Sequence, residues 1–435
     1  MGAAVLENVY TVLVGKNGVG KSRLLADIVK ALRVDLRPTP ADELWGDPEP
    51  KIIAVSTSPF DRFPAPVRSG DNAGSNYRYV GMRRDAFSSF SSVGLVASAA
   101  RGVIEKLGRR TALHGLVSVF EAIGCEPEAA FQFKPTHKSP RSHFLGRDDS
   151  SVLVQSPHLG ELQNLLRSEI HPGLARSFSK KDLEGQWRIL DAVHQMSEWL
   201  SLNRTVTISI NFERREAHID GSFVDSNKFV HSMMVLIDEG FIRFTDLHLQ
   251  KKQFGEMSLR RASSGEQCML VMMLGIAGHI SDGSLVLIDE PEISLHPEWQ
   301  ERFVNLLKSS FNHFSRCQFI IATHSPQIVS EMDPHNSYVL SLSRNMLKNA
   351  AEFSDRSADF QLAELFETPG SRNEYISRRA FNLLARLRAS KQSTDADRAE
   401  LAHLNWLVAA ASPSDPLVEL VESIEKLLGF YAENK

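Results

Sequence analysis

Eight residues near the amino terminus, GKNGVGKS at 15–22, have the composition of a loop that binds phosphate. They fit the pattern G-x-x-x-x-G-K-[ST] at every fixed position, between an apolar run at 9–14 and a helical pattern that begins at Lys21. Glycines let the backbone approach phosphate oxygens, and the N–H groups of a helix start favour an anion. We expect Lys21 to contact the β- and γ-phosphates and the Ser22 hydroxyl to hold Mg²⁺. The alternative is a chance glycine-rich turn that Ser22 caps. The loop residues expected to bind a nucleotide are Gly15, Asn17, Gly18, Gly20, Lys21 and Ser22.

An acidic pair ends a second apolar run, SLVLIDEPE at 284–292. Carboxylates at the end of a buried strand are costly unless they face a cation or a polar cleft. We expect Asp289 to hold Mg²⁺ through its water shell and Glu290 to orient and polarise the attacking water. The alternative is an ordinary strand-to-helix turn in which one carboxylate caps the helix. Because the same chain contains a phosphate loop, we favour the Mg²⁺ and water site over the helix cap.

The segment ASSGEQ at 262–267 precedes an apolar helical run. Ser263 and Glu266 have the spacing of a capping box, and so do Ser264 and Gln267, which predicts a helix start. A glycine in the first turn of a helix is unfavourable, so capping leaves Gly265 unexplained. We expect Ser263, Ser264 and Gly265 to form a second anion cradle at which another molecule's phosphate approaches.

His324 follows the apolar run QFIIA at 318–322. A histidine at the carboxyl end of a strand, beside a phosphate loop, can hydrogen-bond the γ-phosphate or the attacking water. The alternative is a structural histidine with satisfied hydrogen bonds.

Strand and helix patterns alternate around these motifs, which predicts an α/β fold with a mostly parallel sheet. Alternating runs at 205–212 and 241–249 predict additional, half-buried strands. The expected organisation is an ATPase head whose two halves are separated by a helical insertion and followed by a helical C-terminal region. Its boundaries are 1–90 for the first half with the phosphate loop, 91–203 for the insertion, 204–345 for the second half and 346–435 for the C-terminal region.

Composition excludes several classes of protein. The 435 residues carry 49 basic and 53 acidic side chains. The resulting net charge of −4 does not indicate a histone-like protein that coats nucleic acid. Three dispersed cysteines exclude a disulfide framework and a thiolate zinc site. The longest apolar run, at 268–280, has about 13 residues against the roughly 20 that span a bilayer. We therefore expect a cytoplasmic protein without a membrane anchor.

In chain order, GKNGVGKS, ASSGEQ, LIDEPEISLHP and IIATHS resemble the Walker A, signature, Walker B, D-loop and switch-histidine motifs of ABC-type ATPases. Within that superfamily the chain is similar to the branch that includes RecF, Rad50, SMC proteins and the ATPase part of OLD nucleases. LIDEPEISLHPEWQ and QFIIATHSPQIV most resemble the stand-alone ATPases of bacterial anti-phage systems, such as those of Septu and of retrons.

The resemblance implies an ABC-type head that binds ATP and Mg²⁺ and pairs head to tail with a second copy. The signature turn would then complete the partner's site, and Ser294 and His296 would lie between the two sites. Glu290 would be the catalytic base, with Lys21 and His324 as its catalytic neighbours. By resemblance the chain is an ATP hydrolase that acts as sensor and regulator of an anti-phage complex, with a separate nuclease, of the HNH type, as effector. The alternatives are a RecF-like DNA repair ATPase and a nucleotide-gated scaffold with negligible turnover.

Three features depart from that pattern or add to it. No glutamine occurs between Lys21 and Gln132, where the family has its Q-loop, so Ser58 or Asp61 is expected to replace it and hydrolysis to be slow. Asp395 and Asp397 spell the DxD of a nuclease, but their context predicts a loop and a helix start. Six basic residues between 372 and 391 predict a solvated helix face or, alternatively, a face that binds DNA or a protein partner.

Overall fold

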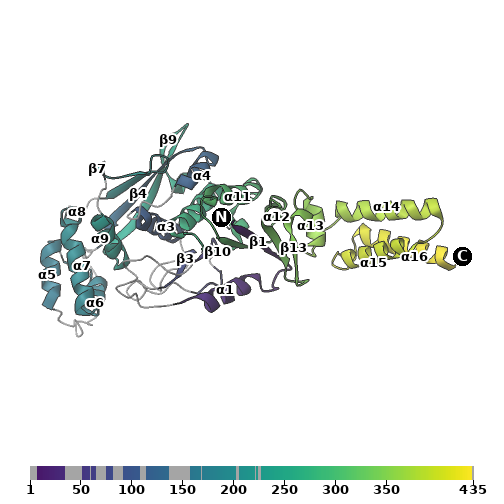
Figure 1. Cartoon of the computed structure of the whole chain (residues 1–435), viewed down its shortest axis with the longest axis horizontal. Coiled ribbons are helices and arrows are strands. Elements are labelled where there is room, and N and C mark those ends of the chain that lie inside the picture. Colours follow the sequence, from purple (N-terminus) through teal and green to yellow (C-terminus); the bar gives the residue numbers. More distant parts are fainter. Residues whose placement is uncertain are drawn as a thin grey trace, which may run out of the picture.

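The computed structural model describes most of the chain and shows an elongated molecule with the C-terminal helices at one end and a helical lobe at the other (Figure 1). The residues described are 7–34, 51–58, 60–64, 75–81, 92–107, 114–136, 157–167, 169–201, 205–220, 222–223 and 227–433.

A seven-stranded sheet forms the centre of the molecule, in the order β13-β12-β1-β11-β10-β2-β3. All neighbours pair in parallel except β12 and β13, which are antiparallel. The predicted fold class is therefore confirmed. The strands are β1 (Val9–Val14), β2 (Ile52–Ser56), β3 (Tyr77–Gly81), β10 (Leu285–Asp289), β11 (Gln318–Ala322), β12 (Ser337–Ser341) and β13 (Met346–Asn349).

Each face of this sheet is covered by helices. On one face, α1 (Lys21–Leu32) buries Leu25 and Val29 against strand residues such as Leu287. On the other face, α10 (Ser264–His279) is apolar all round and almost wholly buried, as a helix between a sheet and other helices must be. The helices α3 (Ser92–Leu107) and α11 (Pro297–Phe311) pack beside α10. Because β1, β2, β10 and β11 run in one direction, their carboxyl ends meet at one edge of the sheet.

A second sheet is antiparallel throughout, in the order β7-β6-β5-β4-β8-β9. Its longest strand, β4, lies within 91–203, where the sequence predicts helices, so that prediction was wrong for this element. Alternate residues of β4, such as Phe131 and Phe133, are buried while their neighbours are half-buried or exposed, which is the period of a strand. The strands are β4 (Cys125–Pro135), β5 (Val206–Asn211), β6 (Glu216–Ile219), β7 (Ser222–Phe223), β8 (Ile242–Lys251) and β9 (Gly255–Ser258).

Helices join this sheet to the rest of the head. The helix α3 of the predicted insertion packs on α10, and so belongs structurally to the head. Farther out, α7 packs against α5 and α9 in the lobe at the left of Figure 1. The helices of this part are α4 (Val117–Ala122), α5 (Pro157–Leu166), α6 (Pro172–Ser179), α7 (Leu183–Gln195), α8 (Ser197–Ser201) and α9 (Asn227–Asp238).

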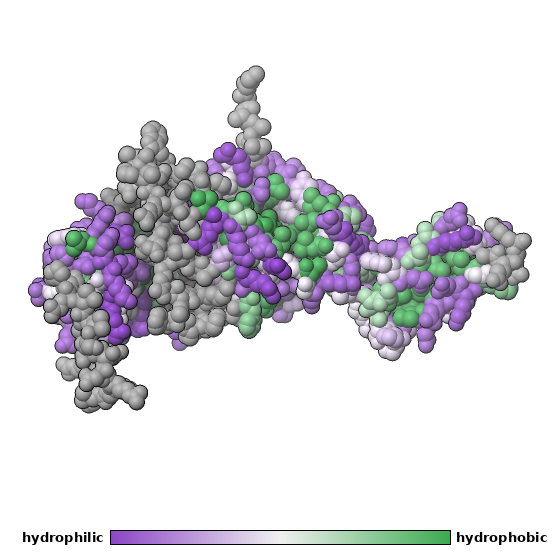
Figure 2. Space-filling model, turned by 90° about the horizontal axis from the view of Figure 1, so that it is seen from below, coloured by the Kyte–Doolittle hydropathy of each residue, from purple (hydrophilic) through white to green (hydrophobic). Residues whose placement is uncertain are grey.

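The C-terminal region is a three-helix bundle with a hydrophobic core of its own, built from residues such as Ile376, Leu404 and Ile424. A narrow waist joins it to the body (Figure 2). Two short helices precede it, α12 (Pro326–Ser330) and α13 (Ala358–Glu364). The bundle comprises α14 (Glu374–Ser390), α15 (Asp395–Val408) and α16 (Pro416–Glu433). Among the described helices, none combines the length and apolarity needed to cross a membrane.

Candidate active site

The predicted phosphate loop connects β1 to α1 at the shared edge of the central sheet. Gly15, Gly18 and Gly20 have φ angles of +145°, +79° and +106°, a region that favours glycine. Gly20 is the N-cap of α1 and offers no side chain to cap the helix, so the first N–H groups of α1 are left for a ligand. The loop therefore has the backbone form that anion binding requires.

Lys21, the first residue of α1, is 4% exposed and points back over this loop. Its Nζ donates a hydrogen bond to the Gly15 carbonyl at 2.9 Å and lies 3.3 Å from Nδ1 of His324. Burial lowers the pKa of Lys21, and three nearby carboxylates oppose that shift. A phosphate within the curve of the loop would replace these neutral partners with an anion, which stabilises a buried ammonium far better.

Ser22 and Asp289 meet where α1 begins and β10 ends. The Ser22 hydroxyl donates to Oδ1 of Asp289 at 2.9 Å. Burial, followed by the charges of neighbouring carboxylates, raises the pKa of Asp289 to about 7, against the hydrogen bond from Ser22. A cation would relieve this repulsion, and hydroxyl and carboxylate oxygens are ligands that Mg²⁺ prefers.

No group of three or more His, Cys, Asp or Glu side chains in the described part of the chain is arranged to hold a metal. Ser22 and Asp289 would thus supply only part of the Mg²⁺ shell, with phosphate and water completing it.

Glu290 stands directly after β10 in a left-handed conformation, with φ +48°. Such a backbone is unfavourable for a side chain larger than glycine and is typical of functional positions. Its N–H donates to the Ala322 carbonyl at 2.9 Å, which fixes it beside the end of β11. The Glu290 carboxylate then lies 3.5 Å from Nε2 of His324.

His324 lies between the ammonium of Lys21 and the carboxylate of Glu290. Burial, with the charge of Lys21, lowers the pKa of His324 to about 4, so the ring is neutral near pH 7. An ammonium can only donate, so Nδ1 accepts from Lys21 and the ring proton is assigned to Nε2, which faces Glu290. The N–H side of the neutral ring therefore faces the Glu290 carboxylate at 3.5 Å.

Glu292 also contributes to this edge, although the sequence motifs assign it no role. One of its carboxylate oxygens accepts a hydrogen bond from the backbone N–H of His324. Burial raises the pKa of Glu292, and the hydrogen bond from His324 opposes that shift. The second glutamate of the DEPE sequence therefore holds the backbone that carries the histidine. Its position in the motif was the only signal for this role.

The turn after β2 contains both residues expected to replace the Q-loop glutamine. The Ser58 hydroxyl accepts from the N–H of Phe60 at 3.2 Å, so it serves the local turn. Asp61 accepts from the hydroxyl of Tyr79 at 2.6 Å, and its charge is among those that raise the pKa of Asp289. Of the two, Asp61 lies where its charge acts on the predicted metal ligand.

The signature turn begins α10. Ser263 is the N-cap, and its capping box with Glu266 is complete; Gln267 instead donates from Nε2 to the Ala262 carbonyl at 2.7 Å. Lys251 of β8 pairs with Glu266 at 2.7 Å and so ties the turn to the second sheet. Ser263 and Ser264 are exposed.

Gly265 has a packing role that the sequence did not reveal. A Cβ at this position would lie 2.8 Å from Cδ1 of Trp299, at the start of α11. The glycine therefore lets α10 and α11 approach each other. Its expected contact with a phosphate stays a prediction.

The signature turn and the phosphate loop share no hydrogen bond or ion pair among the residues that the structure describes. The expected completion of a partner's site by this turn stays a prediction. Farther along the chain than both motifs, Ser294 hydrogen-bonds the Cys268 thiol of α10, and His296 is the exposed N-cap of α11.

The DxD pair and several of the six basic residues between 372 and 391 have structural partners in the C-terminal bundle. Asp397 completes a capping box with Thr394 at the start of α15, as the helix-start interpretation predicts. Arg379 binds both carboxylate oxygens of Glu400, at 2.7 and 2.6 Å, and Arg386 pairs with Asp397 at 3.4 Å. The basic surface that these residues expose is therefore smaller than the sequence suggests.

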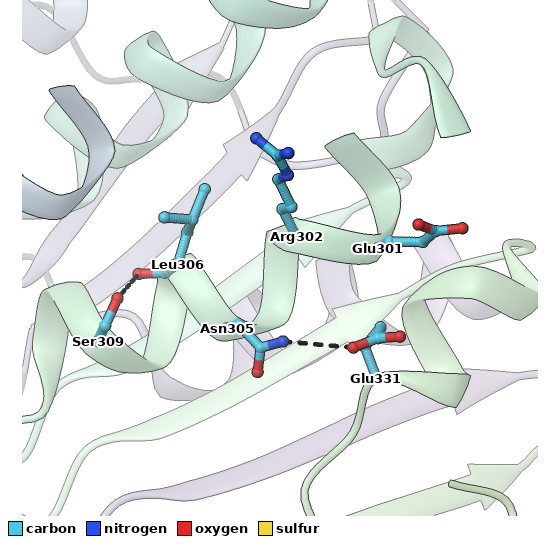
Figure 3. Close-up of a pocket in the computed structure, with 6 residues that line it drawn as sticks. All are labelled: Glu301, Arg302, Asn305, Leu306, Ser309 and Glu331. Atoms are coloured by element: carbon cyan, nitrogen blue, oxygen red, sulfur yellow. Dashed lines mark hydrogen bonds between the residues drawn. The ribbon is translucent and has the colours of Figure 1, made fainter. Parts of the chain in front are cut away.

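A surface groove lies between α11 and Glu331 at the end of α12, and no residue of the phosphate loop lines it (Figure 3). The Asn305 amide donates to Glu331 at 3.3 Å across it. The groove has both acidic and basic walls, and its lining residues are Glu301, Arg302, Asn305, Leu306, Ser309 and Glu331.

Comparison with known proteins places these motifs in a family context. The family described as "AAA domain, putative AbiEii toxin, Type IV TA system" matches residues 131–330, which include the signature turn, the end of β10 and His324.

Two relatives are described as retron ATPases. The "Retron Ec83 probable ATPase" of Escherichia coli is 26% identical over 371 residues, covering 76% of this chain and 66% of that protein. The "Retron Vc95 probable ATPase" of Vibrio cholerae is 29% identical over 123 residues, covering 23% of each protein. The chain thus spans just under two thirds of the first and about a quarter of the second.

Among solved structures, the SMC head domain from Thermotoga maritima matches with a TM-score of 0.19 and 16% identity, covering 34% of this chain and 66% of that one. The family match and the retron relatives confirm the resemblance predicted from the motifs: the chain resembles the ABC-like ATPases of the anti-phage and retron type.

Proposed function

We propose that the chain hydrolyses ATP with Mg²⁺ at the carboxyl edge of its central sheet. The observation that carries this proposal is the meeting of three strand-end motifs in one place: Lys21 contacts His324, His324 contacts Glu290, and Ser22 contacts Asp289. In a purely structural cluster, the buried ammonium of Lys21 would pair directly with one of the three nearby acids. It donates to backbone carbonyls instead, as expected of a group that binds a ligand.

The residues of the site have distinct roles in this proposal. The N–H groups of the loop and Lys21 bind the β- and γ-phosphates. Ser22 and Asp289 would hold Mg²⁺, which would supply positive charge beside the phosphates. Glu290 accepts a proton from the attacking water, and His324 holds its carboxylate in position.

The test is phosphate release from ATP by the wild type and by Glu290→Gln. We expect the variant to lose about 10²- to 10³-fold in kcat, the usual contribution of a general base, while it still binds ATP. Glu298→Gln, which changes an exposed carboxylate on α11, is the matched control and should keep wild-type turnover. Equal turnover in the wild type and Glu290→Gln would remove the catalytic assignment.

The hydrolytic unit is a dimer in this proposal. Ser263 and Ser264 are exposed at the N-terminus of a buried 16-residue helix, so they can reach the phosphates of a second copy. Each copy would then supply the signature turn that the other copy's phosphate loop lacks.

The biological role we propose is the nucleotide-dependent sensor and regulator of a cytoplasmic anti-phage complex. The two retron relatives and the AbiEii-like domain support this role. A separate nuclease, of the HNH type, would be the effector, and DNA is a candidate ligand. The test is a plaque assay with cells that carry the chain and its neighbouring genes: Lys21→Ala should abolish protection, and a neighbouring gene for a nuclease should be required. Neighbours from DNA repair, without protection, would favour a RecF-like role.

A nucleotide-gated scaffold is a second candidate, favoured by one observation. The turn after β2 offers Asp61, already bonded to Tyr79, where the family has a free glutamine. An ATP-dependent dimer without measurable phosphate release would establish this alternative.

A further inference from the structure

The phosphate loop has a second set of contacts, on the side away from Asp289. Lys16 follows Gly15, and its N–H donates to the Ser343 hydroxyl at 3.3 Å, in the turn between β12 and β13. Its ammonium lies 3.1 Å from Oε2 of Glu367, in the segment after α13. The loop is therefore bound both to the sheet hairpin and to the segment that leads into the C-terminal bundle.

Glu367 is itself held by a second cation. Its other carboxylate oxygen lies 3.6 Å from Nε of Arg344, in the same hairpin turn. The Glu367 side chain is only 13% exposed, so screening by water is weak and its position depends on these two cations.

Arg344 connects this pair to the bundle. Its guanidinium lies over the ring of Trp406 on α15, with 4.4 Å between Cζ and the ring centre. It also approaches Oε2 of Glu364, the last residue of α13, at 3.9 Å. A planar cation sandwiched between acids and an indole has few alternative positions.

Glu364 fixes the orientation of the bundle at the same place. Its Oε1 lies 2.7 Å from Nε2 of His403 on α15 and accepts from the Tyr375 hydroxyl on α14 at 2.9 Å. Two helices of the bundle, α14 and α15, are thus anchored to the same glutamate that Arg344 approaches. Figure 1 shows α13 where the bundle joins the body.

We propose that Glu367 is a positioning residue for the phosphate loop and that the C-terminal bundle holds it in place through Arg344 and Trp406. This inference rests on the proposed nucleotide site. A loop that is already held in its binding form loses less conformational freedom when the nucleotide binds. The bundle therefore raises the affinity for ATP without touching it, and by reciprocity ATP strengthens the contact between bundle and body.

The experiment measures nucleotide affinity together with KM and kcat in the 435-residue chain. Glu367→Gln removes the charge that holds Lys16, and Trp406→Ala removes the ring under Arg344. We expect each variant to weaken ATP binding about three- to fivefold, the range of a partly buried ion pair, with the same change in KM and with kcat within about 1.5-fold of wild type.

Two variants serve as controls. Trp406→Phe keeps an aromatic face for Arg344 and should restore wild-type affinity. Glu352→Gln breaks an ion pair with Lys348 beside the same hairpin, away from the phosphate loop, and should change nothing. Unchanged ATP affinity in folded Glu367→Gln and Trp406→Ala, or a fall in kcat with constant KM, would overturn the proposal.

A spectroscopic measurement covers the case in which Glu367→Gln fails to fold. ATP should change the tryptophan fluorescence of the wild type, and Trp406→Phe should lose most of that change. An identical change in both proteins counts against the coupling. A wild type that binds no ATP refutes the proposed function itself, and the positioning role with it.

Discussion

The Ser22 hydroxyl and the Asp289 carboxylate lie 2.9 Å apart although 267 positions separate them in the sequence. The parallel pairing of β10 and β11 and of β11 and β1 brings them together, because it aligns the ends of strands that are distant in the chain. This pair defines the place where a divalent cation would meet the phosphates.

Removing the charge of the Asp289 carboxylate should therefore weaken the binding of Mg²⁺. We expect Asp289→Asn to raise the Mg²⁺ concentration for half-maximal ATPase activity about tenfold or more, since an amide is a weaker ligand than a carboxylate. A magnesium titration of phosphate release measures this. Asp282→Asn, on an exposed turn, is the control. A wild-type magnesium dependence in Asp289→Asn would exclude Asp289 as a ligand.

The composite site of the dimer predicts complementation between two inactive proteins. Lys21→Ala should disable the phosphate loop, and Ser264→Arg should block the signature turn. In an equal mixture, half of the dimers are mixed and each has one intact site, so activity should return to about a quarter of wild type. Phosphate release from the mixture, compared with each variant alone, is the measurement. If each site were completed within one chain, the mixture would recover no ATPase activity.

Gly265 offers a way to separate packing from phosphate contact. A methyl group there would collide with Trp299, and we expect Gly265→Ala to lower the free energy of unfolding by about 1–3 kcal/mol. The double variant Gly265→Ala/Trp299→Leu removes the collision and should recover most of that stability. ATPase activity should stay low in the double variant if a partner's phosphate also needs the space. Full recovery of both properties would leave Gly265 with packing alone. Urea unfolding and phosphate release provide the two readouts.

His324 should make stability depend on pH. Burial and the charge of Lys21 lower its pKa from 6.5 to about 4 in the folded chain. Between these values the unfolded chain binds the extra proton, so the free energy of unfolding falls as the pH falls from 6.5 to 4 and is unaffected above this window. The full shift is reduced by solvent, because 31% of the side chain is exposed. We expect a loss of about 1–2 kcal/mol.

The difference between the wild type and His324→Gln isolates this effect, because other groups titrate in both proteins. Urea unfolding from pH 7 to pH 4.5 should bring the two curves together as the pH falls. Curves that stay parallel over the whole range would show that His324 is not held neutral.

Residues of the site that belong to short motifs were accessible from the sequence. The glycines of the phosphate loop, the acids after β10 and His324 each follow an apolar strand, and the pattern of strands and helices predicts that such ends converge. The helices α1 and α7, which have clear hydrophobic periodicity, and the uniformly apolar α10 occur where they were expected.

Other features depend on contacts that no local pattern encodes. The role of Glu292 comes from a hydrogen bond to a backbone N–H on another strand, and that of Gly265 from the distant Trp299. The strand β4 was missed because helical patterns surround it and tertiary pairing with β5 and β8 decides its conformation. Likewise, nothing in the sequence around Lys16 indicates that Glu367 holds it.

The three cysteines, Cys125, Cys268 and Cys317, are all buried, and burial raises the pKa of each thiol. Maleimides react with the exposed thiolate, so the native chain should be labelled slowly. A single cysteine placed at the exposed Ser423 on α16 would then accept a dye without prior removal of the natural ones. The protein is thus already suited to optical measurement of how its far end moves when a ligand is added.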